Sequence, residues 1–290
     1  AGSFYAFSIW IGLGLLAVYD AIKKYVPDSR FGTFDDLLAL KEKLNAQNLK
    51  LVLDFVPNHF ALDADIVYEH PEYFMQKLEP ANGQDESYFK IMRDEKEYLI
   101  AHGKDSYSPI WTDTAQLNYS NPETKLAMTN ILCEIVSVAD GVRCDMSMLV
   151  MNEIFQRTWN VEIKDEEFWA QTIKKVRVLK PEFIFIAEVY WDTEYKLQQL
   201  GFDYTYDKIL YDRLCERNAE SVTAHLRADD DYQAHSLRFI ENHDEMRAIT
   251  RFSEFFKPAA VISFLAKGSN LVHQGQLEGF TKKIPVQLGR

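Results

Sequence analysis

Short apolar segments alternate with segments of helical period along most of this chain. The clearest is Leu-Val-Leu-Asp-Phe-Val at residues 51–56, which Pro57 closes. A compact apolar run of this kind is typical of a strand buried on both faces, as the strands of parallel sheets are. The pattern predicts further strands at residues 140–144, 183–187, 202–204, 236–240 and 270–273.

The segments between these runs carry helix signals. Thr33 is placed to cap a helix, and Asp36 three residues later completes a capping box. Asn121 followed by Pro122 marks another helix start, because Asn caps well and Pro fits the first turn. Asp165 is predicted to open a third helix. Strands that alternate with helices predict an α/β fold with a parallel sheet, and this many units favour a (β/α)8 TIM barrel.

One long segment, residues 60–117, interrupts the alternation and is rich in Asp, Glu, Tyr and Pro. A structureless loop of that length is improbable in a compact domain. We therefore predict a small inserted domain at 59–116, after the third barrel strand, with the barrel formed by 1–58 and 117–290. Ser8–Ile11 is the candidate for the second barrel strand, and too little chain precedes it for a first, so the barrel is predicted to be incomplete at its N-terminus.

Charge and composition exclude some functions. The chain has 290 residues, 47% of them hydrophobic, and a net charge of −12, which repels phosphate backbones and argues against a nucleic-acid partner. The apolar run from Phe4 to Val18 is shorter than the roughly 20 residues of a membrane span and has no basic region before it. We expect a buried strand there rather than a signal or an anchor, and hence no membrane partner.

The three cysteines, Cys133, Cys144 and Cys215, are odd in number and widely spaced, which predicts neither a disulfide framework nor a zinc site. Free thiols indicate a reducing compartment. We therefore expect a cytoplasmic location, or a secreted one if a leader precedes the chain. The sequence gives no indication of the oligomeric state.

Four predicted strands end in polar blocks, at the edge where barrel active sites are built. The blocks are Asp-Phe-Val-Pro-Asn-His (54–59), Gly-Val-Arg-Cys-Asp (141–145), Ala-Glu-Val-Tyr-Trp (187–191) and Phe-Ile-Glu-Asn-His-Asp (239–244). A single acidic residue after a strand is often a turn former or a helix cap. Four blocks in succession, with 43 residues from Asp145 to Glu188 and 56 from Glu188 to Asp244, favour an active site with these three carboxylates.

These four blocks, in this order, resemble the four short conserved regions of the alpha-amylase family, glycoside hydrolase family 13, and the resemblance extends from about Tyr19 to Gly279. It implies a retaining hydrolase that cleaves α-glucosidic bonds in α-glucan oligosaccharides through a covalent glycosyl-aspartate. In this sequence the nucleophile falls on Asp145, the general acid/base on Glu188 and the transition-state stabiliser on Asp244.

The resemblance also implies substrate-binding roles for Arg143, His59, His243 and Tyr19. An ion pair for Arg143, buried positions for the histidines and core packing for Tyr19 are the structural alternatives. No cofactor is implied as required, although Asn58 matches a position that some members use for calcium.

The chemistry of a retaining glycosidase makes demands on this site. It needs one ionised and one protonated carboxyl group about 5–5.5 Å apart. We expect Arg143 to lower the pKa of Asp145, and the neighbours Val189, Tyr190 and Trp191 to raise the pKa of Glu188 by removing water.

The substrate remains open at this stage. Many members of the family carry Lys-His shortly after the nucleophile, whereas this chain has Met146-Ser147-Met148, which favours a glucosidase-like enzyme over an endo-acting amylase. The preference between α-1,4 and α-1,6 bonds is not indicated. Two alternatives stand beside hydrolysis: an α-glucan transglycosylase, and a non-catalytic binding protein with this fold.

Overall fold

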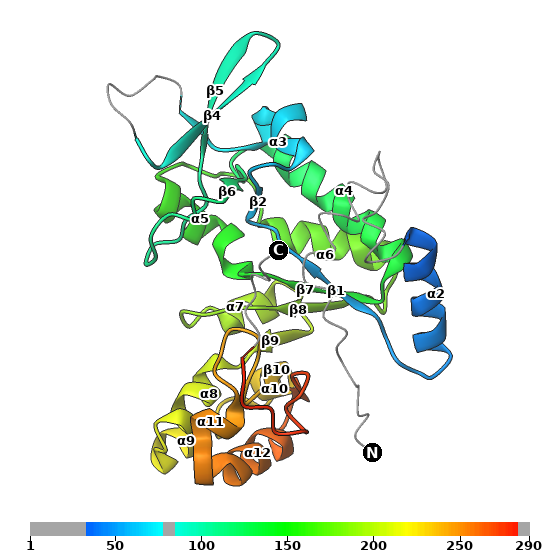
Figure 1. Ribbon diagram of the computed structural model, residues 1–290, viewed down its shortest axis with the longest axis vertical. Coiled ribbons are helices and arrows are strands. Elements are labelled where there is room, and N and C mark those ends of the chain that lie inside the picture. The colour runs from blue at the N-terminus through cyan, green and yellow to red at the C-terminus, as the bar shows by residue number, and fades with distance from the viewer. Residues whose placement is uncertain (1–32, 78–84, 284–290) are drawn as a thin grey trace.

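The computed structural model describes residues 33–77 and 85–283, and at its centre lies one parallel sheet (Figure 1). Its six strands follow one another in the order β1-β7-β8-β9-β10-β11, and each pairs in parallel with the next. The strands are β1 (Val52–Phe55), β7 (Gly141–Cys144), β8 (Ile184–Ala187), β9 (Tyr204–Tyr206), β10 (Ser236–Arg238) and β11 (Ser269–Asn270). The predicted α/β class with a parallel sheet is confirmed.

The predicted eight strands are not all seen. Among the described residues, β1 and β11 form the two edges of the sheet. Each of them pairs with one neighbouring strand only, so the sheet is not closed. The candidate strand Ser8–Ile11 lies outside the described residues. The sequential order of the six strands is the order in a (β/α)8 barrel, so the described chain forms a six-strand portion of that architecture.

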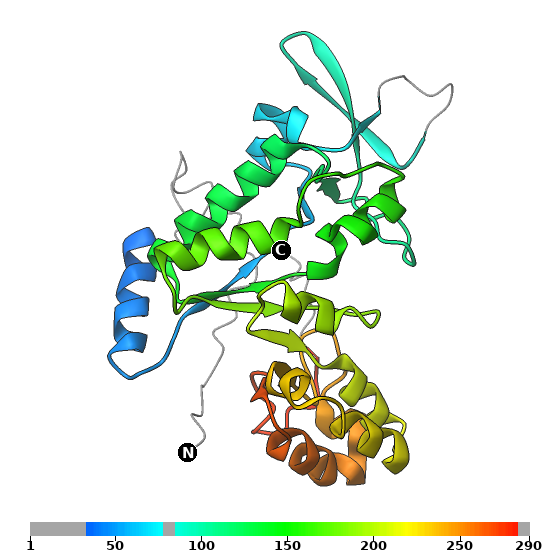
Figure 2. The ribbon, with the colours of Figure 1, turned by 180° about the vertical axis from the view of Figure 1, so that it is seen from behind.

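Helices connect and flank the strands. They are α2 (Phe34–Asn45), α4 (Pro122–Val138), α5 (Asn152–Trp159), α6 (Phe168–Leu179), α7 (Glu194–Gln199), α8 (Lys208–Cys215), α9 (Ala219–Leu226), α10 (Asp230–Ala234), α11 (Ala248–Phe252) and α12 (Phe256–Leu265). In Figures 1 and 2, α4 and α6 lie side by side along one part of the sheet, and α8 to α12 gather at the opposite end of the molecule. Short 3₁₀ turns follow β7 (Ser147–Val150) and α11 (Ser253–Phe255).

The helix caps in the structure show which of the predicted helix starts are correct. Both hydrogen bonds of the Thr33–Asp36 capping box are present, and the side chain of Asn121 accepts the backbone N–H of Glu123 at 2.9 Å. The helix predicted to open at Asp165 instead begins three residues later, at Phe168. Asp165 provides no cap, because its carboxylate faces Lys125, with 3.7 Å between them.

The segment between β1 and α4 contains β2 (His59–Ala61), α3 (Asp65–Glu69), a 3₁₀ turn (Pro71–Tyr73), β3 (Gln76–Lys77), β4 (Tyr88–Arg93), β5 (Lys96–Ala101) and β6 (Thr114–Gln116). The β4–β5 hairpin points away from the central sheet in both ribbon views. Antiparallel pairing of β2 with β6, His59 opposite Gln116, brings the two ends of the segment together. A division of the chain into two domains at these ends stays a prediction.

Apolar packing beneath the sheet supports the strand ends. Trp169 is fully buried on α6, and its ring meets Phe202 edge-on at 4.9 Å and Phe55 of β1 at 6.4 Å. Its indole N–H donates to the carbonyl oxygen of Ser147 at 2.8 Å. Because Ser147 lies two residues after the 141–145 block, this contact anchors the chain where β7 leads into the predicted active site.

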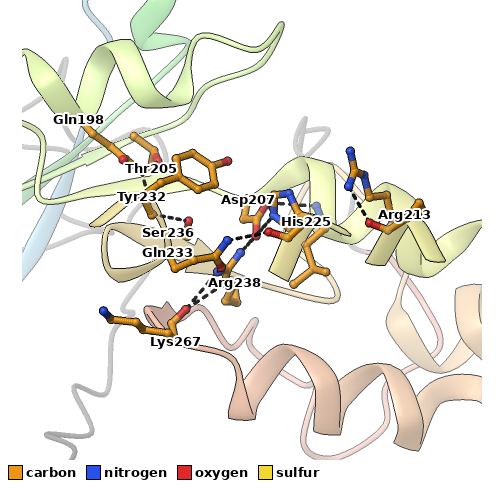
Figure 3. Close-up of polar contacts among 12 residues, drawn as sticks. Gln198, Thr205, Asp207, Arg213, His225, Tyr232, Gln233, Ser236, Arg238 and Lys267 are labelled. Carbon is orange, nitrogen blue, oxygen red and sulfur yellow. Dashed lines mark hydrogen bonds and ion pairs between the residues drawn. The ribbon is translucent and has the colours of Figure 1, made fainter. Parts of the chain in front are cut away.

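A buried polar network joins β9 and β10 to the helices outside them (Figure 3). Arg238 and Asp207 form an ion pair with no exposed surface on either side chain. His225 lies 2.9 Å from an Asp207 oxygen, and Arg238 also donates to Gln233 and to the carbonyl oxygen of Lys267. A buried charge is tolerated when it is paired and hydrogen-bonded, so each group here depends on its partners.

Candidate active site

The parallel pairing continues past the strand ends and fixes the spacing of two carboxylates. The N–H of Asp145 donates to the carbonyl oxygen of Phe55 at 2.9 Å, and the N–H of Glu188 donates to that of Cys144 at 3.0 Å. Asp145 and Glu188 therefore follow directly after the paired residues Cys144 and Ala187. Neighbouring strands lie about 4.8 Å apart, close to the separation of about 5–5.5 Å that a retaining glycosidase needs.

Arg143 lies at the centre of the site and contacts three carboxylates. Its Nη1 atom lies 2.8 Å from Oδ1 of Asp54 and 3.0 Å from Oδ1 of Asp145, and its Nη2 atom lies 2.5 Å from Oε2 of Glu188. The Tyr206 ring packs against the guanidinium, with its centroid 5.8 Å away. Arg143 is thus an ion-pair partner of the proposed nucleophile and of the proposed acid.

Asp54 was not identified as a site residue from the sequence. It lies within β1, in register with Arg143 on β7. The signal was present in the sequence, since a carboxylate inside an otherwise apolar strand needs a cationic partner.

Three donors converge on the buried carboxylate of Glu188. Oε2 accepts from Arg143 and from the backbone N–H of Met146, the latter at 3.0 Å, and Oε1 accepts the Tyr190 hydroxyl at 2.8 Å. Hydrogen bonds of this kind favour the ionised form of a carboxylate. Met146 can donate because it is in the left-handed region, with φ 41°, so the residue after the proposed nucleophile contributes through its backbone.

The protonation of Asp145 differs from the prediction. Burial raises its pKa to about 8, the charge of Arg143 opposes the rise, and the charges of Glu188 and Asp54 add to it. Arg143 lowers this pKa as expected, but its one guanidinium is divided among three carboxylates and does not outweigh burial, so the net pKa is raised. Near neutral pH, the raised pKa therefore keeps Asp145 protonated.

Asp244 follows β10, in a turn held by Asn242, whose side-chain oxygen accepts the N–H of Asp244 at 2.9 Å. Burial alone would raise the pKa of Asp244, but the net effect is a lowered pKa, mainly through the hydrogen bond from His243, whose Nε2 lies 3.0 Å from Oδ2. The charge of Arg143 also lowers this pKa. The structure thus brings Asp145, Glu188 and Asp244 to one edge of the sheet.

His59 and Asn58 lie where β1 leads into β2. Burial lowers the pKa of His59 to about 4, so its ring is neutral near pH 7, and it packs 5.4 Å from Trp111. Asn58 is buried, and its side-chain amide pairs at both ends with that of Gln116, at 3.2 and 3.0 Å. Tyr19 lies outside the described residues.

The side-chain oxygen of Asn58 accepts from Gln116, and a calcium role for Asn58 stays a prediction. Residues 33–77 and 85–283 contain no group of three His, Cys, Asp or Glu residues placed to hold a metal ion. Those residues also contain no helix that is both long and apolar enough to cross a membrane.

Two aromatic side chains meet beside the site, and the sequence analysis did not identify them as a pair. Tyr107, from the segment between β5 and β6, is 69% exposed and meets Trp191 edge-on at 4.8 Å. Trp191 and Asp192 both have left-handed backbones, with φ 67° and 57°, in the turn that follows Glu188 and Tyr190. Consecutive non-glycine residues in this region are strained, and such strain clusters at ligand-binding sites.

Comparison with known proteins identifies the family of the chain. Residues 17–288 match the alpha amylase catalytic domain family. Alpha-amylase 3 of Dictyoglomus thermophilum is 23% identical over 252 residues, which cover 81% of this chain and 47% of that protein. A probable oligo-1,6-glucosidase 2 of Bacillus subtilis is 24% identical, with 89% of this chain and 54% of that protein covered. The chain thus spans about half the length of the curated relatives it matches.

Solved structures show the same likeness. A noncanonic maltogenic alpha-amylase from Thermotoga neapolitana superposes with a TM-score of 0.63 at 26% identity, over 88% of this chain and 53% of that one. An alpha-amylase from Lactobacillus plantarum superposes with a TM-score of 0.65 at 23% identity, over 88% and 57%. With the family match covering nearly the whole chain, this protein belongs to the alpha-amylase family, glycoside hydrolase family 13.

Proposed function

We propose that the protein is a retaining glycoside hydrolase that cleaves α-glucosidic bonds in α-glucan oligosaccharides. The observation that carries the proposal is the placement of Asp145 and Glu188 on adjacent parallel strands, with Arg143 contacting both. Two carboxyl groups at that separation suit a double displacement, because no room is left for a water molecule between them and the sugar.

In the first step, an oxygen of Asp145 attacks the anomeric carbon and the bond to the leaving sugar breaks. Glu188 gives its proton to the leaving oxygen and becomes a carboxylate. In the second step, that carboxylate takes a proton from water as the water attacks the anomeric carbon, and the bond to Asp145 breaks. Asp244, ionised beside His243, stabilises the positive charge that develops on the sugar in both steps.

The chemistry requires the proton on Asp145 to move to Glu188 before Asp145 attacks the anomeric carbon. In the arrangement described here it resides on Asp145, whereas the reaction needs it on Glu188. A sugar bound with its anomeric carbon facing Asp145 favours the ionised nucleophile, since that carbon carries partial positive charge. The leaving oxygen at the same time offers a proton on Glu188 a hydrogen-bond acceptor. Substrate binding itself therefore drives this proton from Asp145 to Glu188.

The names of similar proteins support the substrate class. The relatives include alpha-amylases, a cyclomaltodextrinase and a probable oligo-1,6-glucosidase. Similar structures were solved with maltose and with acarbose. The presence of all three carboxylates disfavours a non-catalytic binding protein, and the absence of Lys-His after Asp145 keeps a glucosidase-like preference as part of the proposal.

A second candidate function is transfer of the glycosyl group to another sugar. The contact between the exposed Tyr107 and the half-buried Trp191 favours it, because aromatic faces beside the acid offer an acceptor sugar a stacking surface. Product analysis at high acceptor concentration separates the two outcomes: longer oligosaccharides indicate transfer, and glucose or shortened chains without longer products indicate hydrolysis.

The decisive experiment compares Asp145→Asn and Glu188→Gln on 4-nitrophenyl α-glucoside and maltotriose. We expect Asp145→Asn to lose at least about 10³-fold on both, because no covalent intermediate forms. Glu188→Gln should lose more on maltotriose than on the aryl glucoside, since nitrophenolate leaves without an acid. Glu153→Gln, an exposed carboxylate paired with Lys196, is the matched control and should retain activity.

Trapping the intermediate tests the nucleophile directly. A slow fluorinated glucosyl fluoride should add one fluoroglucosyl group to a peptide that contains Asp145, and none in Asp145→Asn. Full turnover by either variant on maltotriose contradicts the assigned roles.

A further inference from the structure

We propose that Tyr190 is a positioning residue for Glu188, and that its hydroxyl sets the pH at which the acid loses its proton. The inference rests on the proposed function, because it assigns Tyr190 a role in the same reaction. It gives a hydrogen-bonding role to Tyr190, a residue of the 187–191 block that the sequence suggests only as an apolar neighbour of Glu188.

The geometry of Glu188 divides its two oxygens between different donors. Oε2 accepts from Arg143 and Met146, and both of these are fixed by β7 and the turn after it. Oε1 accepts the Tyr190 hydroxyl at 2.8 Å. With Oε2 bound by two fixed donors, Oε1 is the oxygen that can exchange its partner for the leaving oxygen of a substrate.

The Tyr190 hydroxyl is a permanent donor. Burial raises the pKa of Tyr190 far above its ordinary value, and the charge and hydrogen bond of Glu188 raise it further. The phenol therefore keeps its proton throughout the working pH range. A donor of this kind stabilises Glu188 as a carboxylate and disfavours the protonated acid.

Other charged and titratable groups also surround Glu188. They are Arg143 and Asp145 from β7 and its end, Asp54 from β1, Tyr206 from β9 and, beyond Tyr190, Asp244 after β10. Each of these groups remains when the Tyr190 hydroxyl is removed. The effect of that single donor can therefore be measured against a constant background.

The backbone holds Tyr190 in place. The hydroxyl of Thr193 donates to the carbonyl oxygen of Tyr190 at 2.7 Å, and the left-handed Trp191 and Asp192 fix the turn between them. When Glu188 passes its proton to the leaving oxygen, the Tyr190 hydroxyl keeps its own proton and donates to the new carboxylate. Tyr190 thus disfavours the acid of the first step and stabilises the base of the second.

The test is the pH profile of kcat/KM for Tyr190→Phe on maltotriose. Loss of one hydrogen bond to a carboxylate should move the alkaline limb upward by about 0.5–1 pH unit. Tyr195→Phe, an exposed tyrosine on α7, is the matched control and should leave the profile in place. Incorporation of a fluorinated tyrosine at 190, which is a stronger donor, should move the limb downward.

The outcomes are distinct. An alkaline limb that stays in place in Tyr190→Phe, or moves downward, overturns the inference. If the Phe variant does not fold, the fluorotyrosine protein decides alone, and an unmoved limb there also overturns it. A wild-type protein that hydrolyses neither maltotriose nor α-glucosyl fluoride contradicts the proposed function itself, which is a different result from an active enzyme with an unmoved limb.

Discussion

The Nη2 atom of Arg143 lies 2.5 Å from Oε2 of Glu188, so the guanidinium binds the proposed acid more closely than the proposed nucleophile. The same side chain also pairs with Asp54 at 2.8 Å. Because one positive charge serves three carboxylates, the site retains excess negative charge until it takes up a proton. The position of that proton is a property of the whole cluster rather than of one residue.

Asp54→Asn should move both limbs of the pH profile downward, because removing one negative charge makes every proton in the carboxylate cluster easier to lose. The charge of Asp54 is among the causes that raise the pKa of Asp145, so its removal makes the nucleophile easier to ionise. We expect a shift of about 0.5–1 pH unit and a loss of kcat below about tenfold. Steady-state kinetics from pH 4 to 9 measure both, with Asp212→Asn on α8 as the control. An upward shift of the acid limb would contradict the cluster described here.

Asp145→Asn should stabilise the folded protein at neutral and alkaline pH. The folded pKa of about 8 lies above the ordinary value of 3.8, so the folded state holds a proton that the unfolded chain releases. Wild-type stability therefore falls as pH rises from about 4 to about 8, by at most about 1.4 kcal/mol per pH unit from this group. The amide lacks this proton linkage.

Urea denaturation at several pH values checks that expectation. The stability difference between Asp145→Asn and wild type should grow with pH up to about pH 8 and then level off. A constant difference across that range would mean that Asp145 does not hold the proton in the free protein.

Much of the fold could be predicted from local signals. The Thr33–Asp36 capping box, the Asn121 cap and the apolar run 51–56 each produced the expected element. The predicted helix start at Asp165 was wrong because this possible cap residue forms an ion pair with Lys125. That contact joins α4 to the segment before α6, and no local sequence pattern contains it.

The candidate site was predictable in its residue types but not in its electrostatics. The polar blocks after the strands identified Asp145, Glu188 and Asp244 as candidate carboxylates. The register of β7 with β8 places the first two side by side. The division of Arg143 among three carboxylates depends on three strands at once. For that reason the net rise in the pKa of Asp145 could not be predicted from the sequence.

Arg238→Met should destabilise the protein by about 3–5 kcal/mol, because it leaves the charge of Asp207 buried and unpaired. Adding Asp207→Asn should recover a large part of that loss, since the amide carries no charge and can still accept the N–H of Leu210 at the start of α8. Arg217→Met, which removes an exposed pair with Glu254, is the control and should cost less than about 1 kcal/mol. Chemical denaturation measures all three, and no recovery in the double variant would refute the role given to the ion pair.

Tyr107→Ala should reduce activity on oligosaccharides while sparing a substrate with no sugar in its leaving group. If the Tyr107–Trp191 pair contacts the leaving sugar, its loss lowers kcat/KM for maltotriose by about tenfold, which corresponds to about 1.4 kcal/mol of transition-state binding. α-Glucosyl fluoride has only fluoride to release, so its hydrolysis should change less than about twofold. Tyr68→Ala, an exposed aromatic residue on α3 in the same inserted segment, controls for general effects on that segment. Equal losses on the two substrates would show that Tyr107 supports the fold of the loop and does not contact the leaving sugar.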